Sequence, residues 1–289
     1  MNLILLFLTV LSLSLTSCQY TVRDVVEDFP HDQWTDEEGT SSSQFALVEK
    51  QTAALLPQRP GIIDLYFVGF GSDANQDVFM NEVLYAKRLF DQRFDTQGRS
   101  VALINNRTTA KELPLASFTN LRATLRDISR LLNPEEDILF LFLTSHGSRN
   151  HILTVNYQPW PLRQVSPSEL ATALAESGMK WRVVVISACY SGGFIDKLKN
   201  DYTLIITAAA ANRPSFGCDA EAELTYFGKA FFQDQLTREV RFLHAFEGAR
   251  ALIQQREAEG KVEASNPQVS APPAIVEKLK ALEARLRVQ

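Results

Sequence analysis

Short apolar runs of strand length recur along the chain from Gly61 onward, and longer segments with a helical spacing of apolar residues lie between them. Four of the five runs are nearly all apolar, which is typical of parallel strands that are buried on both faces. The predicted strands are Ile62–Phe70, Val101–Asn105, Ile138–Ser145, Arg182–Ala188 and Leu204–Ala208.

The segments between these runs carry apolar residues on one helical face, as amphipathic helices do. The predicted helices are Val78–Phe94, Phe118–Leu132, Pro167–Ser177, Leu224–Gln235 and Val240–Arg256. Because strands and helices alternate, the sequence predicts an α/β fold whose mostly parallel sheet is covered by helices on both faces. Polar and apolar residues alternate over His151–Tyr157, which predicts a small hairpin after the third strand.

The chain has 289 residues, of which 45% are apolar, and this is enough for one full-sized core. We therefore expect a single domain over residues 61–256. Residues 257–289 are expected to form a polar linker and a C-terminal helix that begins at Pro272-Pro273. One face of this helix carries Ile275, Leu279, Leu282 and Leu286, and it can dock on the domain or on a partner.

Residues 1–17 contain the apolar run Leu3–Val10 and no charged side chain, which indicates a signal peptide. The segment Leu15-Thr16-Ser17-Cys18 is similar to the lipobox of bacterial lipoproteins, in which Cys18 would be lipidated; an ordinary secretory signal is the alternative. With Gln19 next, we expect an exported lipoprotein that is anchored in the outer membrane of a Gram-negative bacterium and faces the periplasm. Residues 18–60 mix acidic residues, serines and prolines and are expected to tether the lipid to the domain.

The formal net charge is −5, and Lys and Arg are scattered, so the sequence shows no basic stripe for nucleic acid. If Cys18 is lipidated, only Cys189 and Cys218 remain. These two allow a disulfide between them, two inert buried thiols or one reactive thiol, and they exclude a scaffold held by several disulfides.

Two of the buried runs end in residues that carry chemistry, His146 after the third run and Cys189 after the fourth. In open α/β sheets, ligands bind at the carboxyl ends of the strands. A thiol beside an imidazole is the pair that generates a thiolate able to attack a carbonyl carbon. The backbone N–H groups of Gly147 and Cys189 can stabilise the resulting oxyanion. The sequence therefore predicts a catalytic dyad, with Cys189 as nucleophile and His146 as base.

Ser145-His146-Gly147 and Ser187-Ala188-Cys189 resemble the His-Gly and Ala-Cys signatures of caspase-fold peptidases. The runs Ile206–Cys218 and Leu224–Gly228 are similar to the segments after the nucleophile in the legumain family of cysteine peptidases, which includes the catalytic subunit of the glycosylphosphatidylinositol transamidase. The similarity spans Ile62–Ile253 and identifies the chain as a bacterial member of this family. It implies a caspase-like three-layer α/β/α fold in one domain, with neither metal nor organic cofactor. It also implies a cysteine-type endopeptidase that hydrolyses peptide or protein substrates through a thioester.

The same resemblance suggests roles for three further residues. Asn75 stands where the family has an asparagine that orients the catalytic histidine, although Ser72-Asp73-Ala74-Asn75 also reads as a simple turn. Tyr190 replaces an acidic residue that helps the family recognise asparagine, which puts strict asparaginyl specificity in doubt. Asp77 replaces a basic residue of the specificity pocket. A carboxylate there would favour Arg or Lys before the scissile bond, unless Asp77 only caps the helix that follows.

Other readings of the sequence remain. The same site can transfer the acyl group to an amine, as a transamidase does, or the fold can serve as a non-catalytic binding lipoprotein. Gly69-Phe70-Gly71-Ser72-Asp73-Ala74 matches a dinucleotide fingerprint, so an NAD-dependent oxidoreductase is a remote alternative. Such a unit also needs an acidic residue at the end of its second strand, where this chain has Asn105-Asn106.

Overall fold

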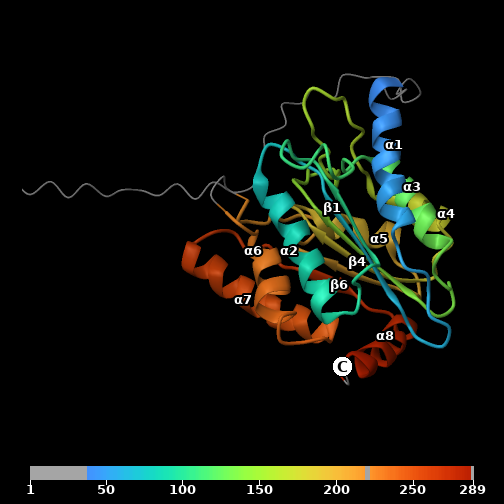
Figure 1. The fold of residues 1–289 in the computed structure, drawn as a ribbon. Helices are drawn as coiled ribbons and strands as arrows, with labels where there is room; N and C mark the ends of the chain where they lie inside the picture. Colours follow the sequence, from blue (N-terminus) through green and yellow to red (C-terminus); the bar gives the residue numbers. More distant parts are fainter. Residues whose placement is uncertain (1–37, 219–221, 288–289) are drawn as a thin grey trace, which may run out of the picture.

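A six-stranded β-sheet runs through the protein (Figure 1). The structure is a computed structural model that describes residues 38–218 and 222–287. The strand order is β2-β1-β3-β4-β5-β6, and every neighbouring pair is parallel except β5 and β6. The strands are β1 (Leu65–Gly71), β2 (Ser100–Ile104), β3 (Ile138–Thr144), β4 (Trp181–Ser187), β5 (Thr203–Thr207) and β6 (Gln268–Ser270).

The sheet confirms the five predicted strands, with differences of a few residues at their ends. β1 begins at Leu65 rather than Ile62, because Gly61 adopts φ +79° and the Ile62 N–H donates to the Arg59 carbonyl in a turn. β6 was not predicted. It has three residues without a run of apolar side chains, and only its antiparallel pairing with β5 makes it a strand.

Side chains of each central strand alternate between two hydrophobic cores, one on each face of the sheet. In β1, Leu65 and Phe67 enter the first core, whereas Tyr66 and Val68 enter the second. The first core is covered by α2 (Asp77–Arg93), α6 (Tyr226–Gly228), the π-helical segment Lys229–Gln235, α7 (Phe242–Gly260) and α8 (Pro273–Leu286). The second is covered by α3 (Phe118–Ser129), α4 (Pro167–Glu176) and α5 (Ile195–Leu198), the last preceded by the 3₁₀ turn Ser191–Phe194. The fold is therefore a three-layer α/β/α arrangement around one mostly parallel sheet.

Helix α1 (Glu38–Ala53) corrects part of the tether expected over residues 18–60. It packs on α3 (Figure 1), and its Val48 side chain is buried. The side-chain amide of Gln51 accepts a bond from the Ala102 N–H and donates one to the Ala102 carbonyl, so it satisfies the edge of strand β2. The sequence did not predict this helix because its apolar residues do not recur on one face. Contacts with α3 and β2 stabilise it, rather than a continuous apolar face.

The C-terminal helix α8 confirms the predicted amphipathic face. Ile275, Leu279, Leu282 and Leu286 are all buried, and they pack into the first core. The docking surface is therefore the domain itself. The segment expected as a linker over 257–270 is partly structured, because it includes the last turn of α7 and strand β6.

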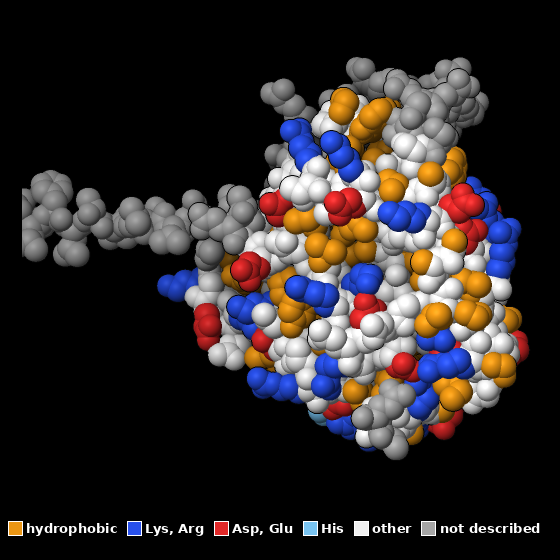
Figure 2. All heavy atoms as spheres, in the orientation of Figure 1, with side chains coloured by type: hydrophobic (Ala, Val, Ile, Leu, Met, Phe, Trp, Pro, Cys, Tyr) orange, Lys and Arg blue, Asp and Glu red, His pale blue; other side chains and the backbone are white. Residues whose placement is uncertain are grey.

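Basic and acidic side chains are interspersed on the molecular face seen in Figure 2. Within residues 38–218 and 222–287, no helix combines the length and the apolarity needed to cross a membrane. The expected signal peptide and Cys18 lie outside the described residues.

Candidate functional site

The pairing of β3 with β4 brings the predicted dyad to one edge of the sheet. Thr144 is in register with Ser187 at the ends of these parallel strands, and the Ser145 N–H donates to the Ser187 carbonyl at 3.2 Å. His146 and Cys189 each follow their strand by two residues. Since the two chains leave the sheet side by side, both residues lie at the carboxyl edge, where open α/β sheets bind ligands.

Gly147, which directly follows His146, packs tightly against the backbone of Cys189. A β-carbon at this position would lie 2.0 Å from the carbonyl oxygen of Cys189, so only glycine allows this approach. The segment predicted as a hairpin supports the arrangement, because Leu153 forms a bridge with Gly147 and the Thr154 N–H donates to the His146 carbonyl at 2.9 Å. The backbone after β3 is thus fixed directly beside Cys189.

The His146 side chain is held in a nearly buried position. Only 7% of the residue is exposed, and the Phe79 ring contacts the imidazole edge to face with 5.1 Å between centroids. Burial lowers the pKa of His146 below its usual 6.5, whereas the negative charge of Asp73 acts in the opposite direction. The neutral imidazole therefore predominates near neutral pH, and this is the form that accepts a proton.

Cys189 is a thiol, so the structure does not contain the alternative Cys189–Cys218 disulfide. The residue is 3% exposed, and burial raises the pKa of its thiol. Ser215 opposes that effect, because its backbone N–H donates to Sγ at 3.2 Å and its hydroxyl lies 3.7 Å from Sγ. The Ser215 N–H is thus placed to stabilise a negative sulfur once the proton has left.

The turn after β1 places Asp73, rather than the Asn75 side chain, in the interior. Asp73 is buried, and its Oδ1 accepts bonds from the Asn75 N–H at 2.8 Å and from the Asn156 amide at 3.2 Å. Asn75 is exposed. The orienting role of Asn75 stays a prediction, and the group whose charge acts on His146 is Asp73.

Asp77 is exposed at the start of α2, where it accepts a bond from the Asn106 side-chain amide at 2.7 Å. The N-cap residue of α2 is Gln76, and its side chain forms no cap hydrogen bond. Asp77 is thus the first helical residue, where a carboxylate interacts favourably with the helix dipole without acting as the cap. Its role in specificity stays a prediction.

Tyr190 is buried in a left-handed conformation, with φ 57°. Its N–H donates to the Arg213 carbonyl at 2.8 Å, and its own carbonyl lies 3.1 Å from Nδ1 of His151. The guanidinium of Arg149 sits 5.4 Å above its ring. The position that carries an acidic residue in the family pattern is therefore filled by a ring that faces a cation.

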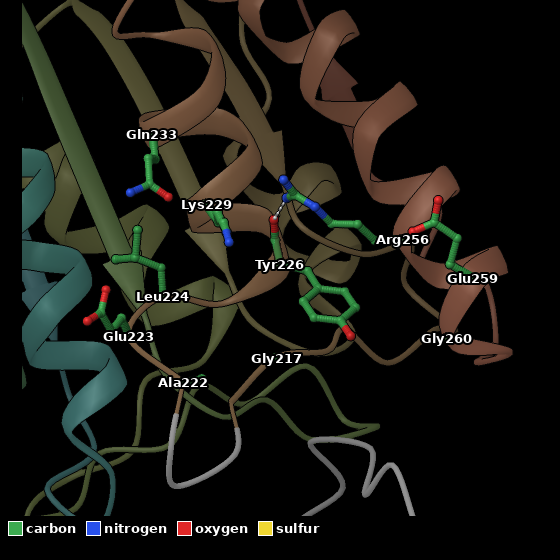
Figure 3. Close-up of a pocket in the computed structure, with 10 residues that line it drawn as sticks. All are labelled: Gly217, Ala222, Glu223, Leu224, Tyr226, Lys229, Gln233, Arg256, Glu259 and Gly260. Atoms are coloured by element: carbon green, nitrogen blue, oxygen red, sulfur yellow. Dashed lines mark hydrogen bonds between the residues drawn. The ribbon is translucent and has the colours of Figure 1, made fainter. Parts of the chain in front are cut away.

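A cavity of about 530 Å³ opens beside the segment that follows Ser215 (Figure 3). Basic and acidic side chains line it together, and they are Lys229, Arg256, Glu223 and Glu259. His146 and Cys189 are not among its lining residues. Over the described ranges, no three His, Cys, Asp or Glu side chains form a cluster suited to a metal ion.

Comparison with known proteins identifies the family of the chain. Residues 126–272, just over half of the chain, match the model of the peptidase C13 family. The chain belongs to the peptidase C13 family. No curated protein matches the sequence. The matched region contains β3, β4, His146 and Cys189.

The C13 family is the family of legumain. Membership of this family confirms the expected fold and the general class of activity. The six-stranded, mostly parallel sheet flanked by helices is the caspase-like fold of C13 proteins. The family comprises cysteine peptidases and related transamidases, so the chain is of cysteine peptidase type.

The glycines that suggested a dinucleotide fingerprint have a packing role in this C13 protein. A β-carbon on Gly69 would lie 2.6 Å from the Val83 side chain, and one on Gly71 would lie 2.7 Å from the Phe79 carbonyl. Both glycines therefore let α2 pack closely on β1. The Asn105 amide donates to the carbonyls of Ser72 and Ala116, so it links two backbone segments.

Asp73 and Ser215 were not singled out from the sequence. Ser215 lies in the run Ile206–Cys218 that carried the resemblance to legumain, and Asp73 lies in the glycine-containing run after β1. Their motifs were visible, but the contact of Ser215 with Cys189 and the effect of the Asp73 charge on His146 arise between segments that are distant in sequence.

Proposed function

We propose that this C13 protein is a cysteine endopeptidase in which Cys189 is the nucleophile and His146 the general base. The β3–β4 register carries the proposal, because it sets both residues at the same sheet edge, each two residues beyond a paired position. The neutral imidazole favoured by burial and the thiol at Cys189 are the starting states that such a reaction requires.

The acylation step begins when His146 takes the proton of the Cys189 thiol. The thiolate attacks the carbonyl carbon of the scissile peptide bond and forms a tetrahedral oxyanion. The N–H groups of Gly147 and Cys189 are the proposed donors to that oxyanion. The C–N bond then breaks, the amine leaves with the proton from His146, and a thioester on Cys189 remains.

The deacylation step consumes one water molecule. His146 accepts a proton from the water as its oxygen attacks the thioester carbonyl, and the returned proton restores the Cys189 thiol as the acid product leaves. If an amine attacks the thioester in place of water, the same proton transfers give a new amide and restore the Cys189 thiol. Transamidation is therefore the second candidate, and the C13 family includes both activities.

The proposal extends to the partners and the location of the protein. Peptides or proteins are its substrates, and Cys18 supplies a lipid anchor to the outer membrane, with the domain in the periplasm. The apolar run Leu3–Val10 and the lipobox-like segment before Cys18 support this part.

The test uses the domain without its signal peptide and a panel of peptidyl acyloxymethyl ketones. In the wild type, the Cys189 sulfur should displace the carboxylate of the reagent and form a thioether. Mass spectrometry locates this thioether on Cys189. Cys189→Ala should abolish labelling, and His146→Ala should slow it by on the order of a hundredfold or more. His244→Ala, which alters an exposed histidine on α7, is the control and should label normally. Labelling of the wild type at a residue other than Cys189 would refute the assignment, and complete absence of labelling would favour a non-catalytic binding protein.

A further inference from the structure

Glu82 is a buried carboxyl group in the interior of the protein. It lies on α2, is 1% exposed, and forms no ion pair within the described residues. Three donors surround it: the Thr144 hydroxyl at 2.5 Å, the Thr225 hydroxyl at 2.5 Å and the Thr225 N–H at 2.9 Å. A carboxyl group without a cation is costly to bury, so a full set of donors is needed to hold it.

The two threonines connect Glu82 to both catalytic strands. Thr144 ends β3, two residues before His146. The Thr225 hydroxyl lies 3.2 Å from the hydroxyl of Ser187, which ends β4 two residues before Cys189. One carboxyl group therefore joins α2 to the ends of β3 and β4.

Thr225 also leads to the segment that contacts the nucleophile. It is the N-cap of α6, and the next residue, Tyr226, donates its N–H to the Phe216 carbonyl at 3.0 Å. Phe216 is adjacent to Ser215, whose N–H donates to Cys189 Sγ. A continuous set of contacts thus runs from Glu82 through Thr225 to the sulfur.

The surrounding backbone is shaped to admit this carboxyl group. A β-carbon on Gly228 would lie 1.8 Å from Oε1 of Glu82, and the Gly228 N–H donates to the Thr225 hydroxyl at 3.0 Å. Only glycine leaves room here, so α6 can begin directly against the carboxyl group. Burial raises the pKa of Glu82, whereas the three donors favour the carboxylate that accepts all of them.

We propose that Glu82 is a positioning residue of the peptidase. Through Thr144 and Thr225 it holds the histidine strand and the Ser215–Phe216 segment in place, so that His146 and the Ser215 N–H keep their positions at Cys189. The inference rests on the proposed function, because it assumes that Cys189 attacks a peptide carbonyl.

The test compares two reagents on the folded protein. Iodoacetamide is small and reports on the Cys189 thiolate itself, whereas a peptidyl acyloxymethyl ketone also reports on how a bound peptide meets the sulfur. Thr225→Val removes the hydroxyl at nearly constant volume. We expect it to slow labelling by the peptidyl reagent, and to lower kcat/KM, by about tenfold or more, and to move the pH midpoint of iodoacetamide labelling upward, because the Ser215 N–H then stabilises the thiolate less.

Matched variants separate positioning from general stability. Thr124→Val makes the same change at another buried threonine, on α3, whose hydroxyl has no hydrogen-bond partner among the described residues, and it should leave both rates unchanged. Glu82→Gln keeps an oxygen acceptor for Thr225 and a polar contact for Thr144, so it should restore most of the peptide rate that Glu82→Leu loses.

The outcomes distinguish this inference from the proposed function. If Thr225→Val matches Thr124→Val in peptide rate, or leaves the pH midpoint of iodoacetamide labelling unchanged, Glu82 is only structural and the inference is wrong. If Glu82→Leu does not fold, the result with Thr225→Val still decides. A wild type whose Cys189 reacts with iodoacetamide but with no peptidyl reagent refutes the proposed function, and the inference with it.

Discussion

The carbonyl oxygen of Cys189 lies so close to Gly147 that a β-carbon on the glycine would be 2.0 Å from it. The residue after the predicted base thus packs directly on the backbone of the predicted nucleophile. In this arrangement a small displacement of one catalytic segment displaces the other, so the dyad depends on the absence of a side chain at position 147.

Gly147→Ala should therefore inactivate the enzyme while the protein remains folded. The methyl group must push the His146 segment away from Cys189, and displacement of a catalytic group by about 1 Å can cost on the order of a hundredfold in rate. Kinetics and thermal unfolding would be measured together. Gly248→Ala is the control, because this glycine lies inside helix α7 and the nearest atoms to a β-carbon there belong to the end of the flexible Gln235 side chain. Full activity in Gly147→Ala would contradict the proposed geometry.

The acid limb of the pH profile should lie below pH 6.5. Burial lowers the pKa of His146, so the neutral base persists to lower pH than in an exposed histidine, and kcat/KM falls only as the imidazole takes up its proton. Asp73→Asn removes the charge that raises this pKa, so the midpoint should move to still lower pH. Asp196→Asn, at an exposed site on α5, should leave the profile unchanged. An unshifted midpoint in Asp73→Asn would show that Asp73 does not act on His146.

Asp77→Asn tests the predicted preference for Arg or Lys before the scissile bond. If the carboxylate binds the substrate cation, kcat/KM for Arg and Lys substrates should fall by about tenfold relative to Asn substrates. Asn106→Ala removes the side-chain partner of Asp77 but keeps the carboxylate, so it controls for the contact at the start of α2. An unchanged ranking of substrates, with only a lower Tm, would assign Asp77 to the helix start.

Glu283 on α8 should make the protein less stable as the pH rises. Burial, opposed by Arg287 and Arg241, raises its pKa from 4.5 to about 7. Between these values the folded protein holds a proton that the unfolded chain has released, so the free energy of unfolding falls across this window and levels off above it. Glu283→Gln should raise Tm at pH 8 and leave it unchanged at pH 4. Glu277→Gln, whose side chain is 76% exposed on the same helix, should show no such difference.

Cys18 should carry a lipid when the full-length gene product is made in a Gram-negative host. Metabolic labelling with a fatty-acid analogue should mark the wild type, and Cys18→Ser should give an unprocessed or soluble form without label. Gln19→Asp would leave lipidation intact and test whether the next residue directs the protein to the outer membrane. An unlabelled wild type would reject the lipoprotein reading in favour of an ordinary secretory signal.

The position of His146 and Cys189 at one sheet edge was predictable because its signals are local. His146 and Cys189 each follow an apolar strand directly, and the buried runs fix where those strands end. Asp73, Ser215 and Glu82 were not predictable as parts of the site. Ser215 contacts Cys189, Asp73 acts on His146 through its charge, and Glu82 is bonded to Thr144 and Thr225; sequence spacing carries no information on such relationships.

By itself the sequence determined the α/β class, the central strands, the helix α8 and the sheet edge at which His146 and Cys189 lie, because apolar periodicity reports burial within each segment. Tertiary structure alone decided that Glu38–Ala53 is a helix docked at the sheet edge, that Gln268–Ser270 is a strand, and that Glu82 can be buried without a cation. These features depend on partners distant in sequence: the amide of Gln51 on β2, the edge of β5, and the donors Thr144 and Thr225. A polar group is stable in such a place only once the fold has brought its partners to it.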